Sequence, residues 1–145
     1  MAFDIRKPFS VPLNYYRKVY AEHVLEYFSH KELCKVLRNV RSFLRSGVHF
    51  FISVPDLDKY ISLYLNKSFD NKLIAYEPAV VSKEPADILN YIFYINGEHK
   101  HMFNIDSIKY HLQKAGFKNV SKRNFDKNLD SYGRTHDSLC IICQK

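Results

Sequence analysis

The sequence predicts an α/β domain with a mostly parallel sheet. Along the 145 residues, strand-like apolar runs alternate with segments of helical periodicity, and two strand-like runs close the chain. Hydrophobic residues make up 46% and charged residues 26%, values at which a chain of this length buries a core. We expect one domain over residues 1–145, with about four strands that are parallel except for an antiparallel strand near one edge, flanked by helices.

The first half of the chain carries the clearest elements. Residues 17–22 read as a strand. Ser29 and Glu32 have the spacing of a capping box, so a helix begins there, and apolar residues then recur at helical spacing until Gly47. We expect this helix over about residues 30–45.

A buried strand and a less regular region follow. The apolar run at 48–54 suits a strand covered on both faces, and Asp56 is placed to cap a short helix that ends near Leu65. Residues 66–100 lack a clear period, which predicts a long insertion or lid. The elements expected after it are a helix opened by Asn104 or Asp106 and closed by Gly116, and strands over 117–125 and 137–144. Since a loop joins these two strands, they should form an antiparallel pair.

The three cysteines favour a structural role. Their odd, sparse number fits a reducing compartment, and hence an intracellular, cytoplasmic protein. Cys140 and Cys143 form a C-x-x-C pair inside a strand-like run, where residues three apart point to opposite faces. We therefore expect two core cysteines and assign no metal site to them.

The net charge of +7 is spread along the chain and not gathered in a dense run. A basic protein can be attracted to nucleic acid, but the sequence holds no recognised nucleic-acid-binding motif. No apolar stretch approaches the roughly 18 residues of a membrane span, and the N-terminus lacks an apolar leader. We expect a solvated basic surface and no membrane association.

Five blocks of sequence occur in a characteristic order. They are YAEHVLE at 20–26, VRSFLRSG at 40–47, ISVPDL at 52–57, GEHKHMF at 97–103 and LDSYGR at 129–134. Together they resemble the C-terminal half of class I S-adenosylmethionine-dependent methyltransferases. The resemblance implies a truncated Rossmann-like methyltransferase sheet that begins near the close of that fold's third strand. The glycine-rich cofactor loop should be missing, because the four glycines are nowhere closer than 17 positions.

The resemblance also implies site residues. Asp4 matches the family's acid near the adenine, and Glu22 lies in the block after the fourth strand, so both are expected to bind S-adenosylmethionine. His23, in the same block, is the expected catalytic base, although a histidine that only hydrogen-bonds the backbone at this turn is equally compatible with the sequence. The residues implied to face the methyl acceptor are His99, Lys100 and His101. His99 and His101 could also bind a metal, but no third ligand is evident in the sequence.

The absent strands would leave residues 17–22 at the edge of the sheet. Unpaired edges invite pairing, so we expect a homodimer or a partner chain to cover this strand. Arg17 and Lys18 could instead blunt the edge and leave a monomer. Tyr27 stands where the family has a second histidine, which removes one candidate site group.

The sequence leaves two functions open. The first is an S-adenosylmethionine-dependent methyltransferase-like protein, either degenerate or completed by a second chain. The second is a non-catalytic binding module that uses the basic face of the 30–45 helix. The residues of that face are Lys31, Lys35, Arg38, Arg41 and Arg45. Binding that weakens steeply with added salt would indicate a nucleic-acid partner.

Overall fold

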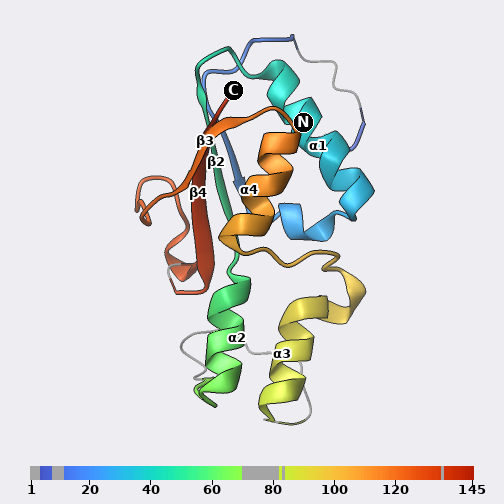
Figure 1. Cartoon of the computed structure of the whole chain (residues 1–145), viewed down its shortest axis with the longest axis vertical. Coiled ribbons are helices and arrows are strands. Elements are labelled where there is room, and N and C mark those ends of the chain that lie inside the picture. Colours follow the sequence, from blue (N-terminus) through green and yellow to red (C-terminus); the bar gives the residue numbers. More distant parts are fainter. Residues whose placement is uncertain (1–3, 8–11, 70–81, 83, 135) are drawn as a thin grey trace.

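The computed structural model describes residues 4–7, 12–69, 82, 84–134 and 136–145. The strands are β1 (Val19–Glu22), β2 (His49–Pro55), β3 (Lys118–Lys122) and β4 (Ser138–Gln144). The helices are α1 (His30–Phe43), α2 (Leu57–Leu65), α3 (Pro85–Tyr94) and α4 (Ile105–Lys114), with short 3-10 turns η1 (Leu25–Tyr27), η3 (Ile95–Gly97) and η4 (Tyr132–Arg134). Figure 1 shows their arrangement.

The four strands form one sheet in the order β1-β2-β4-β3. β1 is parallel to β2, whereas β4 runs antiparallel to both β2 and β3. The predicted fold class, a four-stranded partial Rossmann-like sheet with an antiparallel strand near one edge, is therefore confirmed. Within the described residues, β1 is an edge strand that pairs only with β2.

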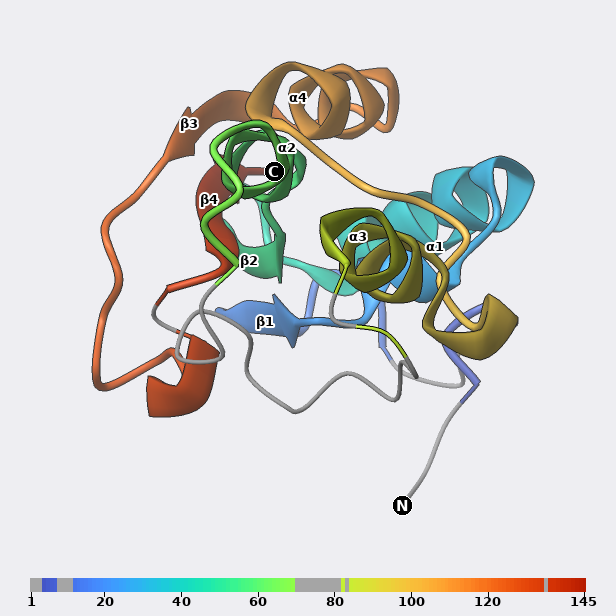
Figure 2. The same cartoon turned by 90° about the horizontal axis from the view of Figure 1, so that it is seen from below.

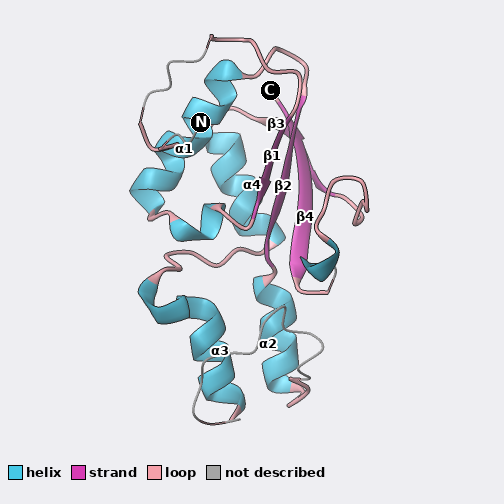
Figure 3. Ribbon diagram, turned by 180° about the vertical axis from the view of Figure 1, so that it is seen from behind, coloured by secondary structure: helices cyan, strands magenta, loops and turns pink. Residues whose placement is uncertain are grey.

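The two faces of the sheet are covered differently. α1 and α4 pack on one face (Figure 2), where the main core lies. The fully buried members of this core include Leu37, Phe50, Ile52, Ile108 and Ile141. The loop that joins β3 to β4, including η4, crosses the other face (Figure 3).

Helix α1 begins as predicted and ends earlier than predicted. The Ser29 hydroxyl accepts a hydrogen bond from the Glu32 N–H, and the Glu32 carboxylate accepts one from the Ser29 N–H, so the capping box is present. The helix stops at Phe43 because Leu44 is extended and forms a parallel bridge with Tyr16. A pairing partner distant in sequence therefore sets this helix end.

The expected insertion at 66–100 contains a regular helix. Residues 70–81 and 83 lie outside the described residues, but α3 begins at Pro85, which suits the first turn of a helix. Tyr60 of α2 packs with Ile88 and Ile92 of α3 in a second, smaller core. The two helices lie side by side beyond the end of β2 (Figure 1).

The cysteine prediction is confirmed, since both residues of the C-x-x-C pair are buried on opposite faces of β4. The Cys143 Sγ lies 3.8 Å from the Phe50 carbonyl oxygen, and the Cys140 Sγ lies 3.9 Å from a carboxylate oxygen of Asp130. Cys34, on α1, is partly exposed. None of the helices described is long and apolar enough to cross a membrane.

Part of the basic face of α1 is used within the fold. The Arg41 guanidinium donates to the Gly116 carbonyl oxygen, and that of Arg45 donates to the Tyr15 carbonyl oxygen. Gly116 has φ +93°, and a Cβ there would lie 2.9 Å from the Arg41 Nε. The first three members of the basic face, Lys31, Lys35 and Arg38, are exposed.

Candidate functional site

A cavity of about 230 Å³ opens at the carboxyl ends of β1 and β2. Ligands of open α/β sheets bind at this end of the strands. The lining residues come from the turn after β1, from η1, from the end of β2, from α2 and α3, from η3 and the segment after it, and from η4. They are His23, Glu26, Tyr27, Pro55, Tyr60, Ile92, Ile95, His99 and Arg134.

His23 enters the cavity through an unusual backbone conformation. It follows β1 directly and has φ +47°, in the left-handed region that non-glycine residues seldom adopt. Its N–H donates to the Ser53 carbonyl oxygen of β2 at 2.8 Å, which holds the turn in place. Such strained positions persist where the surrounding structure fixes them, and they cluster at functional sites.

His23 faces the buried carboxyl group of Glu26. The His23 Nδ1 and the Glu26 Oε1 are 3.5 Å apart, and the Glu26 residue is 1% exposed. No hydrogen bond within the described residues satisfies either carboxyl oxygen of Glu26. Burial raises the pKa of Glu26 to about 7. Burial, reinforced by the charge of Arg134, lowers the pKa of His23 to about 4. At mildly acidic pH the pair is therefore uncharged.

A hydrogen-bond chain holds the other side of the His23 ring. The His23 Nε2 lies 2.7 Å from the Ser138 Oγ, which lies 3.3 Å from a carboxylate oxygen of Asp137. The buried Asp137 also accepts a hydrogen bond of 2.9 Å from the Tyr60 hydroxyl. If Ser138 donates to Asp137, the network assigns the proton of neutral His23 to Nε2. Nδ1 is then an acceptor that faces Glu26.

His99 lines the same cavity as His23, whereas its neighbours Lys100 and His101 lie elsewhere. His99 is buried in the cavity wall, its Nδ1 lies 2.9 Å from the Ile92 carbonyl oxygen, and its ring contacts that of Tyr27. Lys100 and His101 do not line the cavity. Their backbone N–H groups both donate to the Glu26 carbonyl oxygen, at 2.8 and 3.1 Å.

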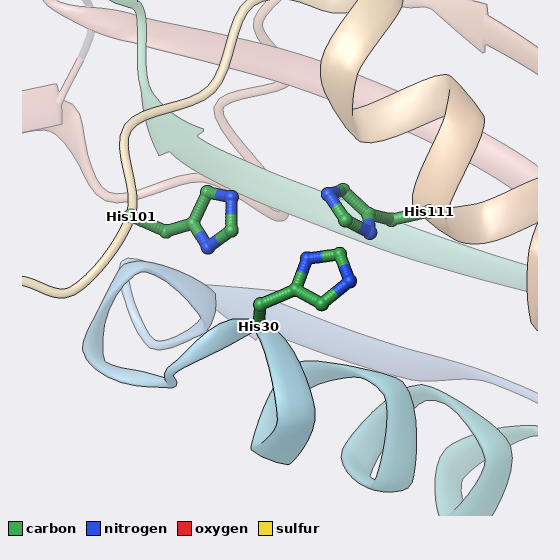
Figure 4. A group of neighbouring side chains, drawn as sticks. All are labelled: His30, His101 and His111. Carbon is green, nitrogen blue, oxygen red and sulfur yellow. The ribbon is translucent and has the colours of Figure 1, made fainter.

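The ring of His101 lies with two histidines from other elements. His30 is the first residue of α1, and His111 lies on α4. Figure 4 shows the three rings turned toward one shared space. The pair His99 and His101 therefore does not act as a unit, because the two side chains occupy different surroundings.

The two residues expected to bind the cofactor are placed outside the cavity lining. Asp4 hydrogen-bonds with Arg6, which lowers the pKa of Asp4. The Glu22 carboxylate accepts hydrogen bonds from the Tyr20 hydroxyl and from the Ser131 N–H and hydroxyl. Glu22 thus anchors the loop that carries Arg134 into the cavity. The cofactor-binding roles of Asp4 and Glu22 stay predictions.

Sequence reasoning missed three lining residues that carry chemistry, namely Glu26, Tyr60 and Arg134. Glu26 had a usable signal, because it lies three residues after His23, a spacing that puts two side chains on one face of a helical turn. Arg134 ends one of the five characteristic blocks. Tyr60 gave no signal, since it reads as an ordinary apolar position of α2.

Comparisons with known proteins agree with this architecture. Residues 2–122 match a family model described as a methyltransferase domain. No curated protein matches the sequence. The structure is similar to a SAM-dependent methyltransferase from Archaeoglobus fulgidus, with 18% identity and a TM-score of 0.61 over all of this chain and 66% of the other.

Two further solved structures are similar. One is a putative O-methyltransferase from Nostoc punctiforme, with 13% identity and a TM-score of 0.61. The match covers all of this chain and 35% of the other. The other comes from a complex of the Trm112 methyltransferase activator with a putative methyltransferase from Haloferax volcanii, with 9% identity and a TM-score of 0.60 over 99% of this chain and 60% of the other.

The chain thus spans about one third to two thirds of the length of these structures. At such low identity the likeness concerns the fold. The family model, in contrast, spans most of the sequence, and the sheet order places the cavity where this fold binds ligands. This chain belongs to the methyltransferase domain family.

Proposed function

We propose that this chain forms the acceptor-side half of an S-adenosylmethionine-dependent methyltransferase. The observation that carries the proposal is the cavity at the carboxyl ends of β1 and β2, with the buried pair Glu26 and His23 in its wall. The family membership supports the reaction class. The remaining wall of the site is then supplied by another chain, or by another copy of this one.

Glu26 is the group best suited to accept a proton. Methyl transfer to an oxygen or nitrogen atom releases the proton of the acceptor's O–H or N–H, and a base with a pKa near the working pH removes it most effectively. The pKa of Glu26, about 7, meets this requirement, and its carboxyl oxygens have no hydrogen-bond partner in the described part of the chain. His23, with a pKa of about 4, stays neutral and positions the carboxyl group.

The other lining groups indicate the class of acceptor. Tyr27, Tyr60 and Ile92 offer aromatic and apolar surface, and Arg134 supplies a positive charge. A small molecule with an apolar or aromatic body, an anionic group and a nucleophilic hydroxyl or amine fits this set. Arg134 would pair with the anionic group and hold the nucleophile toward Glu26.

The residues of this chain do not fit the whole cofactor by themselves. Three glycines have positive φ, but they lie apart at Gly47, Gly97 and Gly116, and no two form the close turn that cradles such a ligand. The backbone N–H groups of Lys18, Tyr20 and Glu22 point away from β2, because the N–H of His23 points toward it and directions alternate along a strand. A strand added there, from a homodimer mate or another partner, would complete the site.

Two further observations bear on the proposed assembly and on where it works. The Haloferax volcanii structure that resembles this fold was solved in a complex with a methyltransferase activator. All three cysteines of this chain are free thiols, which fits the proposal that the assembly works in the reducing cytoplasm.

The test combines association with ligand binding. Sedimentation over a range of concentrations gives the assembly state, and equilibrium dialysis with S-adenosylhomocysteine gives the bound fraction at each concentration. We expect ligand binding to appear with association. Lys18→Pro removes an outward N–H just before β1 and should weaken both association and ligand binding, whereas the matched Lys18→Ala variant keeps the N–H and should weaken neither.

The base is tested in the assembled form. With labelled S-adenosylmethionine and a panel of small phenols, hydroxy acids and amines, Glu26→Gln should lower the transfer rate by about 100-fold or more. A monomer that binds the cofactor unaided would refute completion by another chain. Absence of cofactor binding in every association state, including with added partner, would refute methyl transfer.

A further inference from the structure

We propose that His30, His101 and His111 form a binding site for a first-row transition-metal ion, with Zn²⁺ as the best-suited occupant. The three histidines, here called the three-histidine cluster, lie outside the cavity lining. The proposal concerns only these residues and stands whether or not the chain takes part in methyl transfer.

Three separate elements bring the rings together. His30 begins α1, His101 lies in the segment that leads to α4, and His111 lies on α4 itself. Each ring offers one nitrogen such that all three nitrogens lie within 4.8 Å of one another. The rings converge on one space (Figure 4). Ligand nitrogens of a tetrahedral Zn²⁺ site lie roughly 3.4 Å apart, given bonds of about 2.0–2.1 Å, so modest ring rotations close the site.

Unsatisfied polar atoms point to a ligand at this place. The Nδ1 atoms of His101 and His111 are buried, and neither has a hydrogen-bond partner within the described residues. Buried polar atoms are seldom left without a partner, because each one costs free energy. The ring of His101 is also fixed in orientation, since it stacks on Phe103 with centroids 4.8 Å apart and planes 2° apart. A metal ion would supply the missing partner.

The donor set selects the class of ion. Three imidazole nitrogens suit Zn²⁺, Cu²⁺ or Ni²⁺, whereas Mg²⁺ and Ca²⁺ require oxygen ligands. No carboxylate or thiol of the described residues joins the group. The side chain of His30 is exposed, so a fourth position is open to water. Three histidines with one water molecule is a known coordination of Zn²⁺.

Metal titration of tag-free protein, stripped with a chelator beforehand, tests the proposal. We expect one Zn²⁺ per chain by calorimetry, a thermal midpoint Tm that rises with free Zn²⁺, and the visible absorption of tetrahedral Co²⁺ when Co²⁺ replaces Zn²⁺. Mg²⁺ should produce none of these changes.

The variants separate this site from other histidines. His30→Asn changes an exposed side chain and should leave the fold intact while it lowers Zn²⁺ affinity by more than about 100-fold, which exceeds the usual effect of losing an outer-shell partner. His111→Asn should do the same, but its position is buried, so His30→Asn is the deciding variant. The control is His136→Asn, which removes an exposed histidine elsewhere and should leave the affinity unchanged. Unchanged Zn²⁺ affinity in His30→Asn, equal loss in His136→Asn, or no Zn²⁺ binding by the unaltered protein would each overturn the proposal.

Discussion

Replacing either Glu26 or His23 should change the slope of the free energy of unfolding against pH. The two replacements should change this slope in opposite directions. Burial raises the pKa of Glu26 from 4.5 to about 7, so the native state favours the protonated acid. The resulting stabilisation is complete below pH 4.5 and is lost as the pH rises through 7. Burial lowers the pKa of His23 from 6.5 to about 4, so the native state resists protonation, and stability is lost as the pH falls from 6.5 to 4.

The two effects have similar size. Each shift corresponds to about 3 kcal/mol when it is fully developed. Between pH 4.5 and 6.5 the unfolded chain carries the proton on His23, and the native chain carries it on Glu26. The number of bound protons is then equal, and the pair adds no slope to the unmodified protein. In Glu26→Gln only the His23 effect survives, so stability should rise by about 2 kcal/mol from pH 4.5 to 6.5, the part of the full effect that falls in this pH range.

The matching variant is His23→Asn, since asparagine tolerates the left-handed backbone of this position. Its stability should fall by about 2 kcal/mol over the same pH range, because only the Glu26 effect survives. Urea unfolding followed by circular dichroism at pH 4.5, 5.5 and 6.5 measures both slopes. The expected midpoint change is about 0.7 to 2 M urea.

The control is Glu98→Gln, which removes an exposed acid near the cavity and should follow the unmodified protein. Flat profiles for both variants, or slopes of the same sign, would show that burial does not set the protonation of this pair. The assignment of Glu26 as the base near neutral pH would then lose its physical basis.

Two other predictions concern the opposite face of the sheet and the thiols. Asp130→Asn should lower the free energy of unfolding by about 3 to 5 kcal/mol in urea titrations. The Asp130 carboxylate accepts two hydrogen bonds of 2.5 Å from the nearly buried Arg123 guanidinium, and the substitution would leave that charge unpaired. A loss as small as that of an exposed ion pair would contradict this prediction. Burial raises the pKa of Cys143 to about 12 and also raises the pKa of Cys140. A thiol reagent should therefore label the partly exposed Cys34 first in the native protein. If mass spectrometry finds Cys143 labelled as fast as Cys34, the packing of β4 described above is contradicted.

The sequence predicted elements well where the signal was local. The start of α1 follows from Ser29 and Glu32, and the start of α2 follows from Asp56, whose side chain accepts a hydrogen bond from the Asp58 N–H. These caps depend on residues only two or three positions apart. The end of α1 was predicted two residues too late, because the bridge between Tyr16 and Leu44 joins segments that local periodicity does not connect.

The site was less predictable for the same reason. His23 and Glu26 come from one turn, but His99 and Arg134 reach the cavity from two distant segments, the one that follows η3, and η4 itself. His30 and His111 were not grouped with His101 because three separate elements carry these histidines, and only packing brings their rings together. Of the residues that the resemblance implies, His23 and His99 line the cavity, whereas the partners of each side chain follow only from packing.

The cavity and the three-histidine cluster share one structural wall, and Glu26 is the residue that joins them. Its side chain faces the cavity, while its carbonyl oxygen accepts the backbone N–H groups of Lys100 and His101. The His101 ring belongs to the cluster, and His99, two residues earlier, lines the cavity. A metal ion that fixes His101 would therefore restrict the segment that carries His99 and the turn that carries Glu26. The backbone anchor of Glu26 therefore acts together with His23, whose ring faces the carboxyl group, in directing that group into the cavity.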